Sequence, residues 1–335
     1  MDLSSLYLGL KLKHPIIASA SPLTATLDGI RRLEDAGAAA VVMASLFEEQ
    51  VRAEDTAYAQ YTDRGSYSQS EAGSYFPHLP DYDRGVSGHL ETVRRAVESV
   101  GIPVIASLNA VTIEGWTGYA VRLEQAGAAA LELNAYAIPA DAAVSGQDVE
   151  ARHIDIVRAV RSAVKIPIAV KLAPYFSSTG HMVRRLADSG ADGLVLFSRF
   201  YQPDFELSTL SVKSELKLST PHDTGLPLLW IALLAGTLDR SLAATSGVET
   251  SEQVVKYLLA GADAVMTTSA LLRHGPAYVT QLVAGLSAWL GENGYTSVAP
   301  VRGLKSLRRQ ADVGELLRAQ YMQLLTEYLP AQPPA

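Results

Sequence analysis

The segment EQAGAAALELNAY (residues 124–136) joins the end of a predicted helix to a predicted strand. A glycine just past a helix supplies a left-handed cap without steric cost. The apolar run that follows lacks polar alternation, which indicates a strand buried on both faces and hence a parallel sheet. The same order of features recurs in EDAGAAAVVMASL (34–46), ADSGADGLVLFSR (187–199) and LLAGADAVMTTSA (258–270). The chain therefore repeats one helix-to-strand unit.

Four more short apolar runs lie between these units, at residues 16–21, 103–109, 167–174 and 242–247. The stretches between successive runs mostly have apolar residues at helical spacing and charges on the opposite face. Eight strands alternating with helices predict an α/β fold, a (β/α)8 TIM barrel, with residues 1–335 as a single domain. A doubly wound open sheet is the alternative, but eight similar units favour closure.

Two segments exceed ordinary connections between a strand and a helix. Residues 46–90 follow the second strand and are rich in Tyr, and residues 199–225 follow the sixth and contain alternating pieces typical of a small hairpin. Both insertions should emerge at the C-terminal face of the barrel, as a lid, a dimer contact or surface decoration. The C-terminal segment 303–335 predicts a helix that packs on the barrel, with a frayed end.

Composition excludes several classes of function. The net charge of −7 argues against a nucleic-acid partner. The absence of cysteine excludes disulfides, thiolate nucleophiles and cysteine-based zinc sites. The seven histidines have no ligand spacing, so no metal site is predicted. With no signal peptide and no apolar run long enough to span a membrane, we expect a cytoplasmic protein without a membrane partner.

Polar residues at the C-terminal ends of the strands should converge on one place. Helix N-capping is the alternative role for any single Ser or Thr, whereas a whole ring favours a ligand site. The set comprises Ser19, Ser21, Ser45, Asn109, Asn134, Lys171, Ser198, Thr245, Ser246, Thr268 and Ser269.

Lys171 is the most informative member of this ring because its neighbours in PIAVKLAP are apolar. Burying an ammonium without a partner is costly. It either pairs with Glu132 on the neighbouring strand or faces an electron-rich ligand atom in the barrel mouth. The turns after the last two strands, in residues 245–254 and 267–275, carry hydroxyls and lead into helices, an arrangement that binds phosphate in such barrels. No dinucleotide or Walker motif is present.

Several motifs together resemble one family. They are HPIIASASP (14–22), ASLNAVTIEGW (106–116), GAAALELNAYA (127–137), IPIAVKLAPY (166–175), GADGLVLFS (190–198) and the segment 246–275. They resemble the class 1 dihydroorotate dehydrogenases and the flavin domain of dihydropyrimidine dehydrogenase, in the same order from about residue 3 to 290. The resemblance implies an FMN-dependent oxidoreductase that transfers hydride between a dihydropyrimidine-like small-molecule substrate and FMN. It leaves open the electron acceptor and whether the chain forms a homodimer.

The resemblance also assigns roles to residues. Asn134 and Lys171 would be catalytic, with Lys171 approaching the N1/O2 edge of the flavin; Tyr136 is a further catalytic candidate that the resemblance does not supply. The cofactor would contact Ala18, Ser19, Ser45, Asn109, Asn134, Lys171, Ser198, Thr245, Ser246, Gly247, Thr268 and Ser269. Within this set Ala18 and Ser19 would lie against the flavin ring, and Ser246, Gly247, Thr268 and Ser269 would bind the phosphate.

The chain departs from the family on the substrate side. Ala137 stands where the family carries a Cys or Ser base, and a methyl group cannot abstract a proton. Ala44 replaces a Lys and Phe197 replaces an Asn. Candidate replacements for the base are Tyr136, Ser45, Glu48, Glu49 or a residue of the Tyr-rich insertion.

Two other functions are alternatives, and Ala137 and Phe197 favour the first of them. One is a flavin-binding paralogue without activity on dihydroorotate. The other is a flavin-free barrel enzyme for a phosphorylated substrate, with Lys171 as a Schiff-base lysine.

Overall fold

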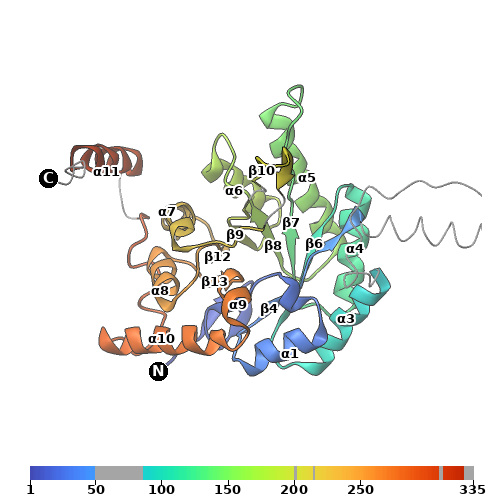
Figure 1. The fold of residues 1–335 in the computed structure, drawn as a ribbon, viewed down its shortest axis with the longest axis horizontal. Coiled ribbons are helices and arrows are strands. Elements are labelled where there is room, and N and C mark those ends of the chain that lie inside the picture. The colour runs from blue at the N-terminus through green and yellow to red at the C-terminus, as the bar shows by residue number, and fades with distance from the viewer. Residues whose placement is uncertain (50–85, 200–201, 214–215, 309–311, 328–335) are drawn as a thin grey trace, which may run out of the picture.

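The computed structural model describes residues 1–49, 86–199, 202–213, 216–308 and 312–327 (Figure 1). Its centre is a closed parallel barrel in which β13 pairs with β3, β3 with β4 and β4 with β6. The predicted (β/α)8 fold is therefore confirmed. The barrel strands are β3 (Ile16–Ala18), β4 (Val41–Val42), β6 (Val104–Asn109), β7 (Ala130–Asn134), β8 (Ile168–Leu172), β9 (Gly193–Leu196), β12 (Ser241–Ala244) and β13 (Ala264–Thr267), with short β5 (Leu46–Phe47) beside β6.

Helices surround the barrel and bury the outward-facing side chains of its strands. The repeated joint identified in the sequence has the expected backbone, because Gly37, Gly127, Gly190 and Gly261 all have a positive φ between 93° and 119°. The surrounding helices are α1 (Leu27–Asp35), α3 (Val86–Ser99), α4 (Ile113–Gln125), α5 (Gly146–Ala163), α6 (Thr179–Asp188), α7 (Gly225–Leu234), α8 (Ser251–Ala260), α9 (Ser269–His274) and α10 (Tyr278–Glu292).

An N-terminal hairpin closes the bottom of the barrel, and sequence analysis did not predict it. Strands β1 (Ser5–Tyr7) and β2 (Leu10–Leu12) pair antiparallel around a two-residue turn at Leu8 and Gly9, both with positive φ. Tyr7 is completely buried. It packs in a cluster with small inward-facing residues that include Ala130, Ala169, Ala243 and Ala264. Small side chains at the bottom of the barrel thus leave room for a plug.

The predicted insertions are described only in part. Residues 50–85 lie outside the described residues, so a Tyr-rich insertion stays a prediction, and Val86 already begins α3. Within 199–225, β10 (Asp204–Glu206) and β11 (Ser211–Lys213) form an antiparallel hairpin. A short 3-10 turn, η2 (Pro221–Thr224), follows it.

The C-terminal segment is helical, but the predicted packing on the barrel is wrong. Helix α11 (Val313–Glu327) has no buried residue and stands apart from the barrel in Figure 1. Its apolar side chains Tyr321, Met322 and Leu324 are 64%, 65% and 69% exposed. Helical propensity therefore specified the element without specifying a partner for its apolar residues. Among the described residues, no helix combines the length and apolarity needed to cross a membrane.

Candidate active site at the C-terminal mouth of the barrel

Two adjoining cavities open at the C-terminal ends of the strands. The first, here called the cradle, has a volume of about 180 Å³. The second, the chamber, has about 550 Å³ and apolar walls that include Phe47, Leu216, Leu218 and Leu272. The cradle brings together the predicted residues Ser19, Lys171, Ser198, Thr245, Ser246, Gly247, Thr268 and Ser269. The chamber adds Asn109, Asn134 and Tyr136 and shares Ser198, Arg199, Thr268 and Ser269 with the cradle.

Two predicted cofactor residues line neither cavity. Ala18 is only 1% exposed. The Ser45 hydroxyl hydrogen-bonds the Ser107 hydroxyl at 2.7 Å. These two residues therefore support the cavity walls in the structure, and a direct contact with a cofactor stays a prediction.

The turn after β12 is shaped to present backbone donors. Ser246 and Gly247 have φ of 79° and 73°, a conformation that is uncommon for serine. The Tyr257 hydroxyl donates to the Ser246 carbonyl at 2.7 Å and holds this turn, and burial raises the pKa of Tyr257. Within the described part of the chain, neither the Ser246 nor the Gly247 N–H donates a hydrogen bond. Free N–H groups in such turns bind anions.

The turn after β13 adds a second group of donors. Thr268 occupies the N-cap of α9 without a side-chain capping bond. Ser269 Oγ accepts hydrogen bonds from Ser219 N at 3.0 Å and Ser219 Oγ at 2.9 Å, so its own proton remains available. Sequence analysis missed Ser219, because it lies in a polar loop far from any strand end. Arg273 donates to the Ser219 carbonyl at 2.7 Å and fixes that loop over the cradle.

Lys171 satisfies both alternatives considered from the sequence. Its Nζ lies 3.3 Å from Glu132 Oε1, and it also lines the cradle. The Lys171 side chain is 14% exposed and the Glu132 side chain 1% exposed. This ion pair with a buried carboxylate holds the end of the Lys171 side chain in place. The cradle therefore has a fixed positive charge at its inner wall.

The chamber side is organised around Asn134. Ser198 Oγ donates to Asn134 Oδ1 at 3.5 Å, and Asn134 lies in register with Lys171 on the next strand. The Tyr136 N–H donates to the Asn134 carbonyl at 2.7 Å, which folds the chain back at the end of β7. Ala137 is exposed and lines neither cavity. The Asn and Tyr side chains therefore face the chamber, while Ala137 adds no polar group.

The candidate bases differ in their surroundings. Glu48 is 3% exposed and accepts from Val111 N at 2.6 Å and from Thr112 N and Oγ1 at 2.8 and 2.7 Å, so it anchors the start of α4. Glu49 is exposed, and the Tyr-rich insertion lies outside the described residues. Of the four named candidates, Tyr136 is the one that lines the chamber.

Arg199 is a site residue that sequence analysis missed. It lines both cavities; its Nη1 donates to the Lys217 carbonyl at 2.7 Å, and its Nη2 lies 3.8 Å from Asp223 Oδ1. The signal was present, since a charged residue directly follows Ser198 at a strand end. It adds a second positive charge at the mouth.

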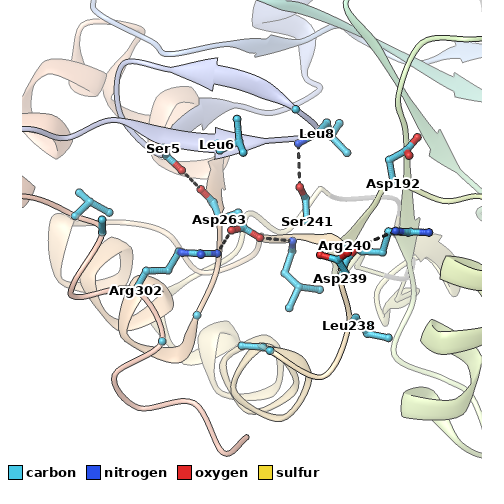
Figure 2. Close-up of a pocket in the computed structure, with 18 of the residues that line it drawn as sticks. Ser5, Leu6, Leu8, Asp192, Leu238, Asp239, Arg240, Ser241, Asp263 and Arg302 are labelled. Carbon is cyan, nitrogen blue, oxygen red and sulfur yellow. Dashed lines mark hydrogen bonds and ion pairs between the residues drawn. The ribbon is translucent and has the colours of Figure 1, made fainter.

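A larger cavity, of about 1020 Å³, lies at the opposite end of the barrel (Figure 2). Ser5 Oγ donates to the Asp263 carbonyl, Arg302 pairs with the Asp263 carboxylate, and the Leu8 N–H donates to Ser241 Oγ at 3.0 Å. Burial raises the pKa of Asp263, against the effect of Arg302. These contacts attach the hairpin to β12 and β13, so we assign them a structural role. Across the described ranges, no group of three His, Asp or Glu residues could hold a metal ion.

Comparison with known proteins identifies the family. A family model described as dihydroorotate dehydrogenase matches residues 82–290, more than half of the chain. The chain belongs to the dihydroorotate dehydrogenase family. The resemblance found in the sequence is thereby confirmed. The matched residues include most of the cradle and the chamber.

Relatives of this dihydroorotate dehydrogenase family member carry dehydrogenase names. A putative dihydroorotate dehydrogenase A (fumarate) of Aeropyrum pernix is 31% identical over 217 residues, 62% of this chain and 69% of that protein. The catalytic subunit of a dihydroorotate dehydrogenase B (NAD(+)) of Methanothermobacter thermautotrophicus is 25% identical and covers 88% of this chain and 95% of its own. The NAD-dependent dihydropyrimidine dehydrogenase subunit PreA of Escherichia coli K12 is 22% identical and covers 90% and 76%.

Proposed function

We propose that this family member is an FMN-dependent oxidoreductase that transfers hydride between a small cyclic substrate and the flavin. The observation that carries the proposal is the continuity of the two cavities. Donors suited to phosphate surround the cradle, Lys171 lies at its inner wall, and the chamber shares Ser198, Arg199, Thr268 and Ser269 with it. One ligand can therefore extend from the cradle towards a substrate in the chamber.

The residues of the cradle fit FMN. The free N–H groups of Ser246 and Gly247 and the Ser269 hydroxyl suit a phosphate. When bound, FMN supplies a two-electron acceptor for hydride. The ammonium of Lys171, held by Glu132, would stabilise negative charge as it develops on the ligand. Asn134, oriented by Ser198, would position the substrate and the ring.

The apolar walls of the chamber, which include Phe47, Leu216 and Leu218, support a ligand less polar than dihydroorotate. Ala44 and Phe197 are both buried and apolar where the family has a Lys and an Asn. We infer a dihydropyrimidine-like or other cyclic substrate, oxidised or reduced at a carbon–carbon bond. Tyr136 is our candidate for the proton-transfer group, because it faces the chamber beside Asn134. A soluble acceptor or a partner protein would reoxidise the enzyme.

The Schiff-base alternative is less well supported. A nucleophilic lysine must be a neutral amine that is free to attack, whereas Lys171 Nζ is paired with the Glu132 carboxylate at 3.3 Å. Borohydride trapping of a substrate adduct at Lys171 would nevertheless reverse this preference.

The test begins with the absorbance spectrum of the purified protein. Flavin absorbance, present on purification or gained on incubation with FMN, is expected, and a colourless protein would refute the proposal. Stopped-flow reduction with a panel of dihydropyrimidines, dihydroorotate included, then defines the substrate. Flavin that binds but is bleached by no member of the panel would favour a paralogue without this activity.

A further inference from the structure

Three polar side chains, those of Lys171, Glu132 and Tyr7, lie in two successive layers of the barrel interior, between the mouth and the N-terminal hairpin. We call these three side chains the column. Lys171 and Glu132 point inward, each two residues after Ala169 or Ala130 on its own strand. Both alanines belong to the interior cluster that contains Tyr7. Since alternate residues of a strand share a face, Glu132 and Lys171 form the layer directly above the one that packs Tyr7. The Tyr7 side chain is therefore packed in the layer next to the ion pair.

Two groups in this column are buried without a protein partner. Lys171 pairs with Glu132 Oε1. Among the described residues, the other carboxylate oxygen, Glu132 Oε2, has no hydrogen-bond partner, and the Tyr7 hydroxyl has none either. Tyr7 is 0% and Glu132 1% exposed. Burial is the main cause that raises the pKa of Tyr7, and the negative charge of Glu132 is the second. This effect is expected when Tyr7 and Glu132 both lie inside the barrel. A buried hydroxyl donor and a buried carboxylate acceptor would each lower the stability of the fold if they stayed unpaired.

We propose that one buried water bridges the Tyr7 hydroxyl and Glu132 Oε2, and that Glu132 is the positioning residue that keeps Lys171 charged and directed at the cradle. The N-terminal hairpin is then linked to the ligand site through Tyr7, the water, Glu132 and Lys171. The inference deepens the proposed function, and its flavin measurement rests on that function.

The surroundings suit a single water. A buried water typically makes two to four hydrogen bonds. Tyr7 donates to it, and it donates to Glu132 Oε2. Ser107 offers a third group, because it is 0% exposed and lies in register with Glu132 on the adjacent strand. The water would hold the Glu132 carboxylate in place, and Glu132 in turn holds Lys171 Nζ, which lies 3.3 Å from its Oε1.

The first test measures Lys171 without a flavin. Competitive acylation of the FMN-free protein at one pH, read by peptide mass spectrometry, reports how often the amine is neutral. Lys256 is the internal reference, since it forms an exposed pair with Glu252. In Glu132→Gln, labelling of Lys171 relative to Lys256 is expected to rise about tenfold or more, because the amine loses its ion-pair partner. In Tyr7→Phe a smaller rise, about two- to threefold, is expected.

Ser5→Ala is the matched control for a substitution in the N-terminal hairpin. It removes a hairpin hydrogen bond, to the Asp263 carbonyl, but no group directed at Glu132, so Lys171 labelling should not change. The stability of Tyr7→Phe adds an independent readout. Loss of a bridged hydroxyl lowers the urea midpoint, whereas removal of a truly unpaired hydroxyl raises it or leaves it unchanged.

The flavin measurement is the reduction potential of bound FMN from pH 6 to 9. In Glu132→Gln the potential should shift from the wild-type value across this range, because Lys171 would no longer be held beside the ligand, whereas in Ser5→Ala it should not change. Wild-type labelling of Lys171 in Tyr7→Phe, or a raised urea midpoint, overturns the bridge even if Glu132→Gln does not fold. A colourless protein with the expected labelling would refute the flavin function and leave the column intact.

Discussion

The cradle and the chamber meet at the same mouth but differ in how they are built. The cradle consists of backbone donors and hydroxyls held by further hydrogen bonds, such as those of Tyr257 to Ser246 and of Ser219 to Ser269. The chamber has walls of Leu and Phe with a few amides. The departures from the family at Ala44, Ala137 and Phe197 were predicted on the substrate side, but none of the three lines the chamber, and Phe197 lines the cradle. The comparison teaches that one barrel mouth can hold two unlike cavities, because different strand ends and loops supply their walls.

Lys171 lies where the two halves meet, and its loss should have the largest effect. Lys171→Met leaves Glu132 buried without its partner, which should destabilise the fold by about 3–5 kcal/mol. It should also slow flavin reduction by about 10²–10³-fold, through the loss of a preorganised charge. Urea unfolding and stopped-flow absorbance measure the two effects.

Lys256→Met is the control for that substitution. It removes an exposed pair with Glu252 and should cost less than about 1 kcal/mol. Equal costs for the two variants would contradict the view that the Lys171 pair is a buried, structural charge.

Gly247→Ala tests whether the cradle depends on backbone shape. A Cβ at this residue would lie 2.7 Å from Thr224 Cγ2 and 2.8 Å from the Thr220 carbonyl oxygen, at a φ of 73°. We expect the left-handed backbone to cost about 1–2 kcal/mol and the overlap about 1–3 kcal/mol more. FMN should dissociate from the variant, as an equilibrium binding titration would detect.

Gly294→Ala separates the two causes. Gly294 has a φ of 76°, and no atom lies within 4 Å of the position that a Cβ would take there. It should show the backbone cost alone and retain FMN. Loss of FMN from both variants would mean that general destabilisation, rather than the shape of the cradle, controls binding.

Acid should destabilise the fold through two histidines that lie outside both cavities. Burial lowers the pKa of His89 in α3 to about 4 and also lowers the pKa of His153 in α5. Because both lie below the unfolded value of about 6.5, the folded chain binds fewer protons, and stability falls as pH drops from about 6.5 towards 4. We expect a loss of about 1–2 kcal/mol between pH 7.5 and 5 in urea unfolding. His89→Phe should flatten this dependence, and an unchanged slope would exclude His89 as a cause.

Ala137→Ser should have the smallest effect. The serine restores a hydroxyl where the family carries its base, but Ala44 and Phe197 remain buried and apolar. We therefore expect less than about a tenfold gain in flavin reduction by dihydroorotate, at the low end of what a positioned proton acceptor supplies. A gain of several hundredfold would show that only the base is missing and that the chamber still suits dihydroorotate.

The sequence by itself determined the barrel and most of the mouth. Each copy of the helix–Gly–strand joint requires a left-handed cap before a buried parallel strand. The residues that meet this requirement are neighbours in the sequence, so each joint can be predicted separately. Ser246, Gly247, Thr268 and Ser269 follow from the same rules, because residues at the ends of parallel strands must meet once the sheet closes.

Only the tertiary structure decided which long-range partners these residues have. Tyr7 reaches the barrel interior because small residues such as Ala130 and Ala169 leave space there. Ser219 reaches Ser269 because a loop folds back over the cradle. The sequence predicted that residues of α11 form a helix, but it did not predict which residues, if any, its exposed apolar side chains contact. Such contacts join segments far apart in the chain, and they depend on shape and space that no local pattern of residues encodes.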